Sequence, residues 1–249
     1  MPRVAEDRPE NPPELLVRLE HAAARFAAAA DALTDRQARE TSGLPGWTRG
    51  HVITHVARSA DVYRWLLRLA TTGVEPGPRA DGTALARALR EGAGRDATEL
   101  AADLRRSLDG MLEAAAAVPA DRWATLVSAL AGWRHPAWFT LQRARRELET
   151  HHVDLAVGYG SADWPEAYVA WALDATLPAL AARGFPLARV SAVDLGRTWR
   201  LASDGPSASG SGHALLAWLA GRADGTGLVE EHLLPSPPPW PQPPVPGWD

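Results

Sequence analysis

The chain has 249 residues, of which 46% are hydrophobic and 22% charged, a composition typical of a globular protein large enough to bury a core. Its formal net charge of -4 gives no electrostatic basis for binding nucleic acid or an anionic membrane. Cysteine is absent, which excludes a disulfide framework, a thiolate metal ligand and an internal thiol nucleophile.

The first segment in chain order, residues 1–13, is polar and contains proline without an apolar core. This composition predicts a flexible N-terminus and not a targeting sequence. No later segment approaches the roughly 20 consecutive apolar residues that a membrane-spanning helix needs. We therefore expect a cytoplasmic protein without a membrane partner.

Residues 14–160 carry apolar residues at helical spacing in four stretches, which predicts a four-helix bundle with short to moderate connections. The four stretches are residues 14–32, 49 to about 70, 84–118 and 136–157. Thr48 is a suitable N-cap for the second of them. Gly92 and Gly94 are points at which the third stretch can be interrupted.

Residues 165–234 combine helical patterns with short strand patterns, which predicts a small α+β domain. The helices are expected up to residue 183 and over 211–221, and the strands over 190–195, 198–201 and 228–234. Residues 235–249 are mostly proline with Trp240 and Trp248, so we expect an extended or disordered tail. The fold class predicted for the whole chain is mainly α, a four-helix bundle followed by a small α+β domain.

A carboxylate and an imidazole four residues apart, Glu147 and His151, fall on one face of the fourth predicted helix. On the second predicted helix, His55 lies on an apolar stripe that would face the bundle interior, so the three side chains are expected to converge. Two imidazoles and one carboxylate suit Zn²⁺ with an open position for water or substrate. The alternative for any single histidine on an apolar face is a hydrogen-bonded core residue, which is the commoner fate.

Other polar residues near these three are given different roles. His51, one turn from His55, is expected at the surface or in support of a ligand. His152 and Glu149 point away from the predicted buried stripe, so we expect them to form pairs at the solvent-exposed surface. Asp154 either orients a ligand imidazole or pairs with an arginine. A solvated face is expected for three arginines of the same helix: Arg143, Arg145 and Arg146.

Two motifs stand out, residues 44–58 (LPGWTRGHVITHVAR) and residues 146–155 (RELETHHVDL). Together with residues 163–165 and 215–222 of the second predicted domain, they resemble the mycothiol-dependent maleylpyruvate isomerase family. The resemblance covers nearly the whole chain. It implies a DinB-like four-helix bundle followed by a small α+β domain.

The resemblance also implies a site. Its metal ligands would be His55, Glu147 and His151, the same residues that the helix faces bring together. A catalytic arginine is implied in the second domain, where Arg222 is the best match and a cation stabilising a helix dipole is its alternative role. Three other arginines of that domain are alternatives: Arg189, Arg197 and Arg200. The implied cofactors are zinc, or another divalent metal, and mycothiol, an external thiol that accounts for the absent cysteine.

The activity that the resemblance implies is the cis–trans isomerisation of maleylpyruvate to fumarylpyruvate, a step of aromatic catabolism, or the isomerisation of a related electrophilic carboxylate. A bound thiolate would add to the cis double bond, allow rotation, and leave. One alternative is a zinc-dependent thiol S-transferase that detoxifies electrophiles and releases the conjugate. The other is a metal-binding regulatory or interaction bundle without catalysis.

Overall fold

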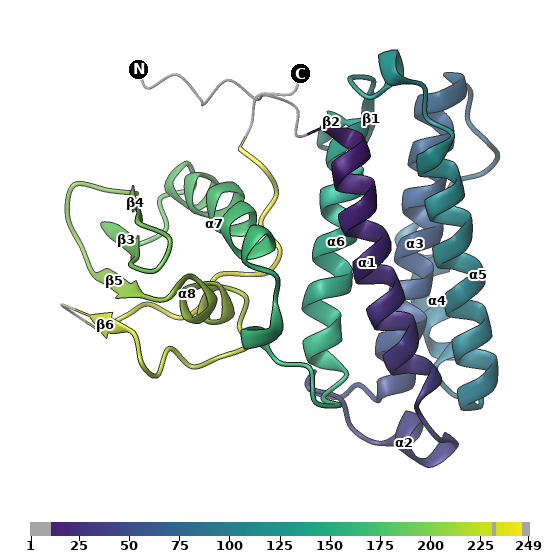
Figure 1. Ribbon diagram of the computed structural model, residues 1–249, viewed down its shortest axis with the longest axis horizontal. Coiled ribbons are helices and arrows are strands. Elements are labelled where there is room, and N and C mark those ends of the chain that lie inside the picture. The colour runs from purple at the N-terminus through teal and green to yellow at the C-terminus, as the bar shows by residue number, and fades with distance from the viewer. Residues whose placement is uncertain (1–10, 231–232, 246–249) are drawn as a thin grey trace. The chain divides into compact units, whose positions relative to one another are not determined.

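The structure, a computed structural model, describes residues 11–230 and 233–245 (Figure 1). It is mainly helical with a small sheet region, so the predicted fold class is confirmed. The chain divides into two compact units, with the boundary in sequence between Val157 and Gly158. The predicted flexible N-terminus, last strand and proline-rich tail each fall partly on residues outside the described ranges. Within those ranges, no helix combines the length and the apolar character that crossing a membrane requires.

Four long helices form the bundle of the first unit, and all four were predicted from the sequence. Their bounds are α1 Pro12–Asp31, α3 Arg49–Thr72, α5 Ala97–Ala116 and α6 Ala137–Asp154. Each helix packs against two others in the order α1, α6, α3, α5 and back to α1 (Figure 1). Their apolar faces meet in one core, whose fully buried side chains include Phe26, Ile53, Leu66, Leu104 and Leu141.

Helix α3 begins at the predicted N-cap. The Thr48 hydroxyl accepts a hydrogen bond from the backbone N–H of His51 at 3.3 Å, and Nδ1 of His51 accepts one from the backbone N–H of Thr48 at 3.2 Å. This reciprocal pair is a capping box in which histidine takes the place usually held by Glu or Gln. The helix ends at Gly73, whose φ of 73° is the left-handed conformation that favours glycine.

The third predicted stretch is interrupted as expected. Helix α4, Gly82–Gly92, ends at the first of the two predicted glycines, and α5 begins after Asp96, whose side chain accepts from the N–H of Glu99. Gly92 lies against α3, where an added Cβ would come within 2.5 Å of the Thr54 methyl. The glycine therefore allows the end of α4 to approach α3 closely.

Several short elements of the first unit were not predicted. They are α2 Asp35–Arg39, the 3-10 turn Ala120–Arg122, and the strands β1 Leu126–Ser128 and β2 Arg134–Pro136. The two strands pair antiparallel, with Val127 opposite His135. Three residues are too few to show a period of two, so the sequence pattern does not indicate these two strands.

In the described residues, the second unit contains the 3-10 turn Ser161–Asp163, two α-helices and a four-stranded sheet. The helices are α7 Glu166–Ala181 and α8 Gly212–Leu219, and the strands are β3 Arg189–Ala192, β4 Arg197–Arg200, β5 Ser207–Gly210 and β6 Val229–Glu230. The strand order is β4-β3-β5-β6, with β3 parallel to β5 and the other neighbours antiparallel. Strand β5 was missed because its sequence, SASG, lacks the β-branched and aromatic residues typical of strands.

Candidate metal centre

Three side chains from two helices converge in the first unit. Nε2 of His55, on α3, lies 3.2 Å from Oε2 of Glu147, on α6, and Nε2 of His151 lies 3.3 Å from the same oxygen. All three candidate ligand atoms lie within 4.8 Å of one another. In the described part of the chain, no other group of three histidine or acidic side chains meets in this way.

The group lies at the margin of the core and not within it. The exposed fractions of the side chains are 34% for His55, 19% for Glu147 and 14% for His151. The prediction that the apolar stripe carrying His55 faces the bundle interior is therefore wrong in the middle of α3: Ser59 and Val62, which follow His55 at helical spacing on that stripe, are also only partly buried. Helix α3 turns its fully buried face toward α5 and the core, which leaves the His55 side accessible beside α6.

Asp154 orients His151, which was one of its two predicted roles. Nδ1 of His151 donates to Oδ2 of Asp154 at 2.8 Å, and the Asp154 side chain is 3% exposed. This hydrogen bond places a proton on Nδ1 and directs Nε2 toward Glu147.

The charges of the group are strongly coupled. Burial lowers the pKa of His151, but hydrogen bonds to Asp154 and Glu147 outweigh burial and raise the pKa to about 9. Burial raises the pKa of Glu147, and the hydrogen bonds from His151 and His55 outweigh it and hold the pKa well below its ordinary value. The carboxylate is thus ionised and attracts a positive charge to this point.

Two aromatic residues that the sequence analysis did not single out support the group. Tyr63 is buried near Glu147, and burial together with the charge of this carboxylate raises the tyrosine pKa, so the hydroxyl stays protonated. The Trp47 ring lies edge-on to the His55 ring, with centroids 5.5 Å apart. Tyr63 follows His55 by eight residues, about two turns of α3, so its spacing in the sequence is the signal that places it near the His55 side of the helix.

His51 does not join the group, because its ring caps α3 as described above. The predicted solvent exposure of Glu149 and His152 is wrong. Glu149 is 1% exposed and accepts from Nη2 of Arg25 at 2.7 Å, and His152 is 7% exposed with its ring against Phe26. Both faces are buried because α6 packs against α1 as well as α3.

The predicted solvated face of three arginines on α6 is also wrong. Arg145 and Arg146 are buried, and Arg145 lies 4.0 Å from the Glu149 carboxylate. Arg143 is half-buried, with its guanidinium carbon 5.1 Å from the ring centroid of Tyr63 and 4.8 Å from that of Trp133. A hydropathy pattern counts arginine as polar, whereas its planar cation can be buried against carboxylates and aromatic faces.

Arg222 lies in the second unit, just after α8. It is half-buried, and its Nη1 donates to the carbonyl of Ala220, the C-cap of that helix, at 2.6 Å. This contact matches its alternative role, a cation at a helix C-terminus.

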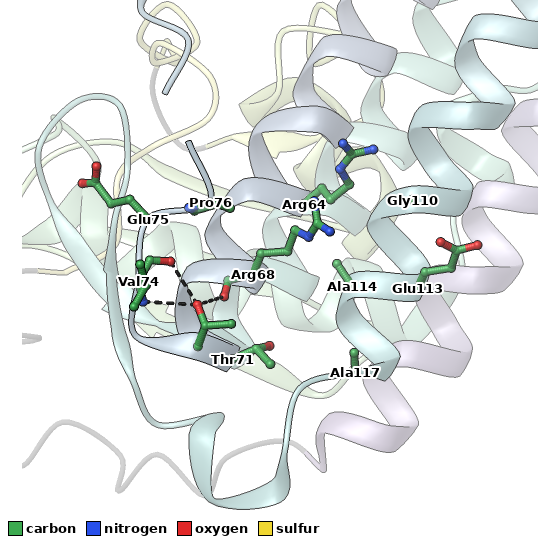
Figure 2. A pocket seen from close by; sticks show the side chains of 11 residues that line it. Arg64, Arg68, Thr71, Val74, Glu75, Pro76, Gly110, Glu113, Ala114 and Ala117 are labelled. Atoms are coloured by element: carbon green, nitrogen blue, oxygen red, sulfur yellow. Dashed lines mark hydrogen bonds between the residues drawn. The ribbon is translucent and has the colours of Figure 1, made fainter. Parts of the chain in front are cut away.

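A cavity of about 660 Å³ lies elsewhere in the first unit, between α3, α5 and the loop that follows α3 (Figure 2). Arg64 and Arg68 of α3 and Glu113 of α5 line it, but none of the three converging residues does. Charged groups of both signs face this cavity, so its lining selects for neither an anion nor a cation.

Comparisons with known proteins identify relatives of the chain. The family profile of the mycothiol maleylpyruvate isomerase N-terminal domain matches residues 19–156, more than half of the chain. The chain is also similar to the crystal structures of a mycothiol-dependent maleylpyruvate isomerase and of a histidine-to-alanine mutant of that enzyme. Each has 25% sequence identity and a TM-score of 0.81, over 92% of this chain and 97% of the other. A search of curated protein sequences found no match.

Proposed function

From the premise that the chain belongs to the mycothiol maleylpyruvate isomerase N-terminal domain family, we propose that it is a metal- and thiol-dependent cis–trans isomerase. Its substrate is maleylpyruvate or a related electrophilic carboxylate with a cis double bond, and its thiol cofactor is mycothiol. The convergence of His55, Glu147 and His151 is the observation that carries this proposal.

The three residues have the chemistry and the spacing of a divalent metal site. Two imidazole nitrogens and a carboxylate oxygen are the donor set of catalytic zinc sites, which keep a further position open. Two donors at about 2.0–2.1 Å around a tetrahedral ion lie roughly 3.3–3.4 Å from each other. The distances of 3.2 Å and 3.3 Å between the histidine nitrogens and the Glu147 oxygen fit this spacing.

Neighbouring residues fix the orientation and protonation of the three candidate ligand side chains. Asp154 fixes the tautomer of His151, so that Nε2 is the free donor once the Nε2 proton is lost. Tyr63 is buried near Glu147 and stays protonated, so it adds no second negative charge beside the carboxylate. The Trp47 ring covers one side of His55 and limits its rotation.

When bound here, the metal would hold the external thiol in its thiolate form, which is the nucleophilic one. Reversible addition of a thiol to the cis double bond makes that bond single, and elimination after rotation returns the thiol unchanged. For the second unit we propose Arg222 as the arginine that supports catalysis, because a guanidinium binds a carboxylate through two parallel hydrogen bonds and keeps its charge at all relevant pH values.

The test is a turnover assay of the purified full chain with mycothiol and maleylpyruvate, in which isomer formation and free thiol are both followed. We expect catalytic formation of the trans isomer with no net loss of thiol, loss of turnover on chelation, and recovery on adding zinc. His55→Ala and His151→Ala are expected to be inactive, whereas His21→Ala, an exposed histidine of α1, keeps full activity. Stoichiometric thiol consumption would instead support the S-transferase, and metal binding without turnover would support a binding module.

A further inference from the structure

Arg143 is held rigidly one helical turn before Glu147. Its guanidinium contacts the rings of Tyr63 and Trp133, and its Nη1 lies 2.9 Å from Nε2 of His135. Arginine has only donors, so Nε2 of His135 must accept, and the histidine proton is on Nδ1, 2.9 Å from the Pro136 carbonyl. Among the described residues, no further hydrogen bond or ion pair of the Arg143 guanidinium is found beyond these contacts.

A second guanidinium approaches from the loop after α3. Arg79 is half-buried, and its guanidinium carbon lies 5.2 Å from the ring centroid of Trp65, whose Nε1 donates to the Gly77 carbonyl at 3.0 Å. The loop is thereby attached to α3. Nε and Nη2 of Arg79 are buried and have no hydrogen-bond partner among the residues that the structure describes.

The two guanidiniums are close enough for their charges to interact. Burial and the charge of Arg143 both lower the pKa of Arg79, and only the exposed Glu75 acts in the opposite direction. Across the described residues, no ion pair joins either Arg79 or Arg143 to a carboxylate. Unpaired like charges that are partly withdrawn from water are costly, and a bound anion removes that cost.

We propose that Arg79 and Arg143 form a binding site for a small organic carboxylate. Resting on the proposed function, this site takes a carboxylate of the isomerase substrate. Arg143 precedes Glu147 by four residues on α6, about 6 Å along the helix axis. Tyr63 lies near both places, because the Arg143 guanidinium carbon is 5.1 Å from its ring centroid and the charge of Glu147 acts on its hydroxyl. A small molecule held by the arginines therefore reaches the group of His55, Glu147 and His151 with its other end.

Calorimetric titration of the full chain with maleate, a cis dicarboxylate that lacks the keto group, tests this site without requiring turnover. We expect the wild type to bind, and Arg79→Gln and Arg143→Gln to weaken binding by at least about tenfold, since each loses a charge-assisted pair of hydrogen bonds. Arg143→Lys keeps the charge but loses the planar fork, so we expect an intermediate loss. Arg36→Gln is the matched control, because the Arg36 side chain is 81% exposed and forms its ion pair with Glu40, at the end of the same short helix.

Additional variants and a folding measurement distinguish a failure of the arginine site from a failure of folding or of the proposed function. Thermal unfolding of each variant reports folding, and Arg79→Gln, in a surface loop, keeps the test valid if Arg143→Gln does not fold. His21→Ala, at the exposed histidine of α1, is expected to keep maleate affinity within about threefold. If His55→Ala abolishes binding while Arg79→Gln has no effect, or if the wild type does not bind, the arginine site is wrong. Maleate binding that depends on the arginines, in a protein without isomerase turnover, would uphold this site and contradict the proposed function alone.

Discussion

Asp154 accepts a hydrogen bond from Nδ1 of His151 at 2.8 Å, within the last turn of α6. The aspartate is almost fully buried, so the bond is shielded from water and from salt. It fixes which nitrogen of His151 faces Glu147 and His55. A metal ligand and its orienting carboxylate thus come from the same helical turn.

Asp154→Ala is therefore expected to weaken zinc binding by about 10–100-fold, because the imidazole loses its fixed tautomer and orientation. Competition with a chromophoric chelator measures this affinity. Asp121→Ala, at an exposed position, is the control and should bind zinc as the wild type does. Equal affinities for Asp154→Ala and wild type would mean that His151 needs no partner or is not a ligand.

The buried imidazole of His135 makes folding stability depend on pH. Burial, together with the charges of Arg143 and Arg79, lowers its pKa from 6.5 to about 4. Between these two values the unfolded chain binds a proton that the folded chain does not, so stability falls as the pH drops from about 6.5 to 4, by up to about 3 kcal/mol. Chemical denaturation across this window should show the slope, and His135→Asn should flatten it. A parallel slope in the variant would assign the effect to other groups.

Glu149 is predicted to matter for stability and not for chemistry. Its buried carboxylate faces Arg145, 3% exposed, and Arg25, 39% exposed. Glu149→Ala removes this negative charge from a buried cationic environment, so we expect the free energy of unfolding to drop by about 3 kcal/mol in urea titrations. Glu20→Ala, an exposed position on α1, should change it by less than about 0.5 kcal/mol. A loss for Glu149→Ala as small as that of the control would show that the pair contributes little.

The backbone of Gly50 on α3 packs so closely against Ala93, the residue that follows α4, that there is no room for a side chain at position 50. A Cβ on Gly50 would come within 2.4 Å of the Ala93 carbonyl oxygen, whereas a Cβ on Gly94 meets nothing within 4 Å. Gly50→Ala is thus expected to destabilise the bundle by about 1–3 kcal/mol through overpacking. Gly94→Ala should be neutral or slightly stabilising. The measurement is the thermal unfolding midpoint of Gly50→Ala compared with that of Gly94→Ala. Equal midpoints would show that α4 moves aside without cost.

The convergence of His55, Glu147 and His151 could be predicted because i, i+4 spacing places Glu147 and His151 on one face of α6, and because His55 lies beside the apolar face of α3, although at the margin of the core. The supporting residues could not. Tyr63 reaches Glu147 only once α3 and α6 are packed in a particular register, and such registers are decided by side chains along both helices.

The errors on α6 have one physical origin. Predicting a single buried stripe assumes that a helix contacts the core on one side, but α6 lies between α1 and α3. Glu149 and Arg145 are buried on the additional face as an opposite-charge pair. Single-sequence periodicity does not distinguish such a pair from two solvated residues, because both patterns contain polar residues at the same positions.

Anomalous scattering at the zinc absorption edge, from a crystal of the zinc-loaded full chain, tests the metal site most directly. The account predicts a single strong peak bonded to His55, Glu147 and His151, with nitrogen and oxygen ligands at about 2.0–2.2 Å and one position left for an external ligand. A peak held by other residues, or no peak at this group in a protein saturated with zinc, would contradict it.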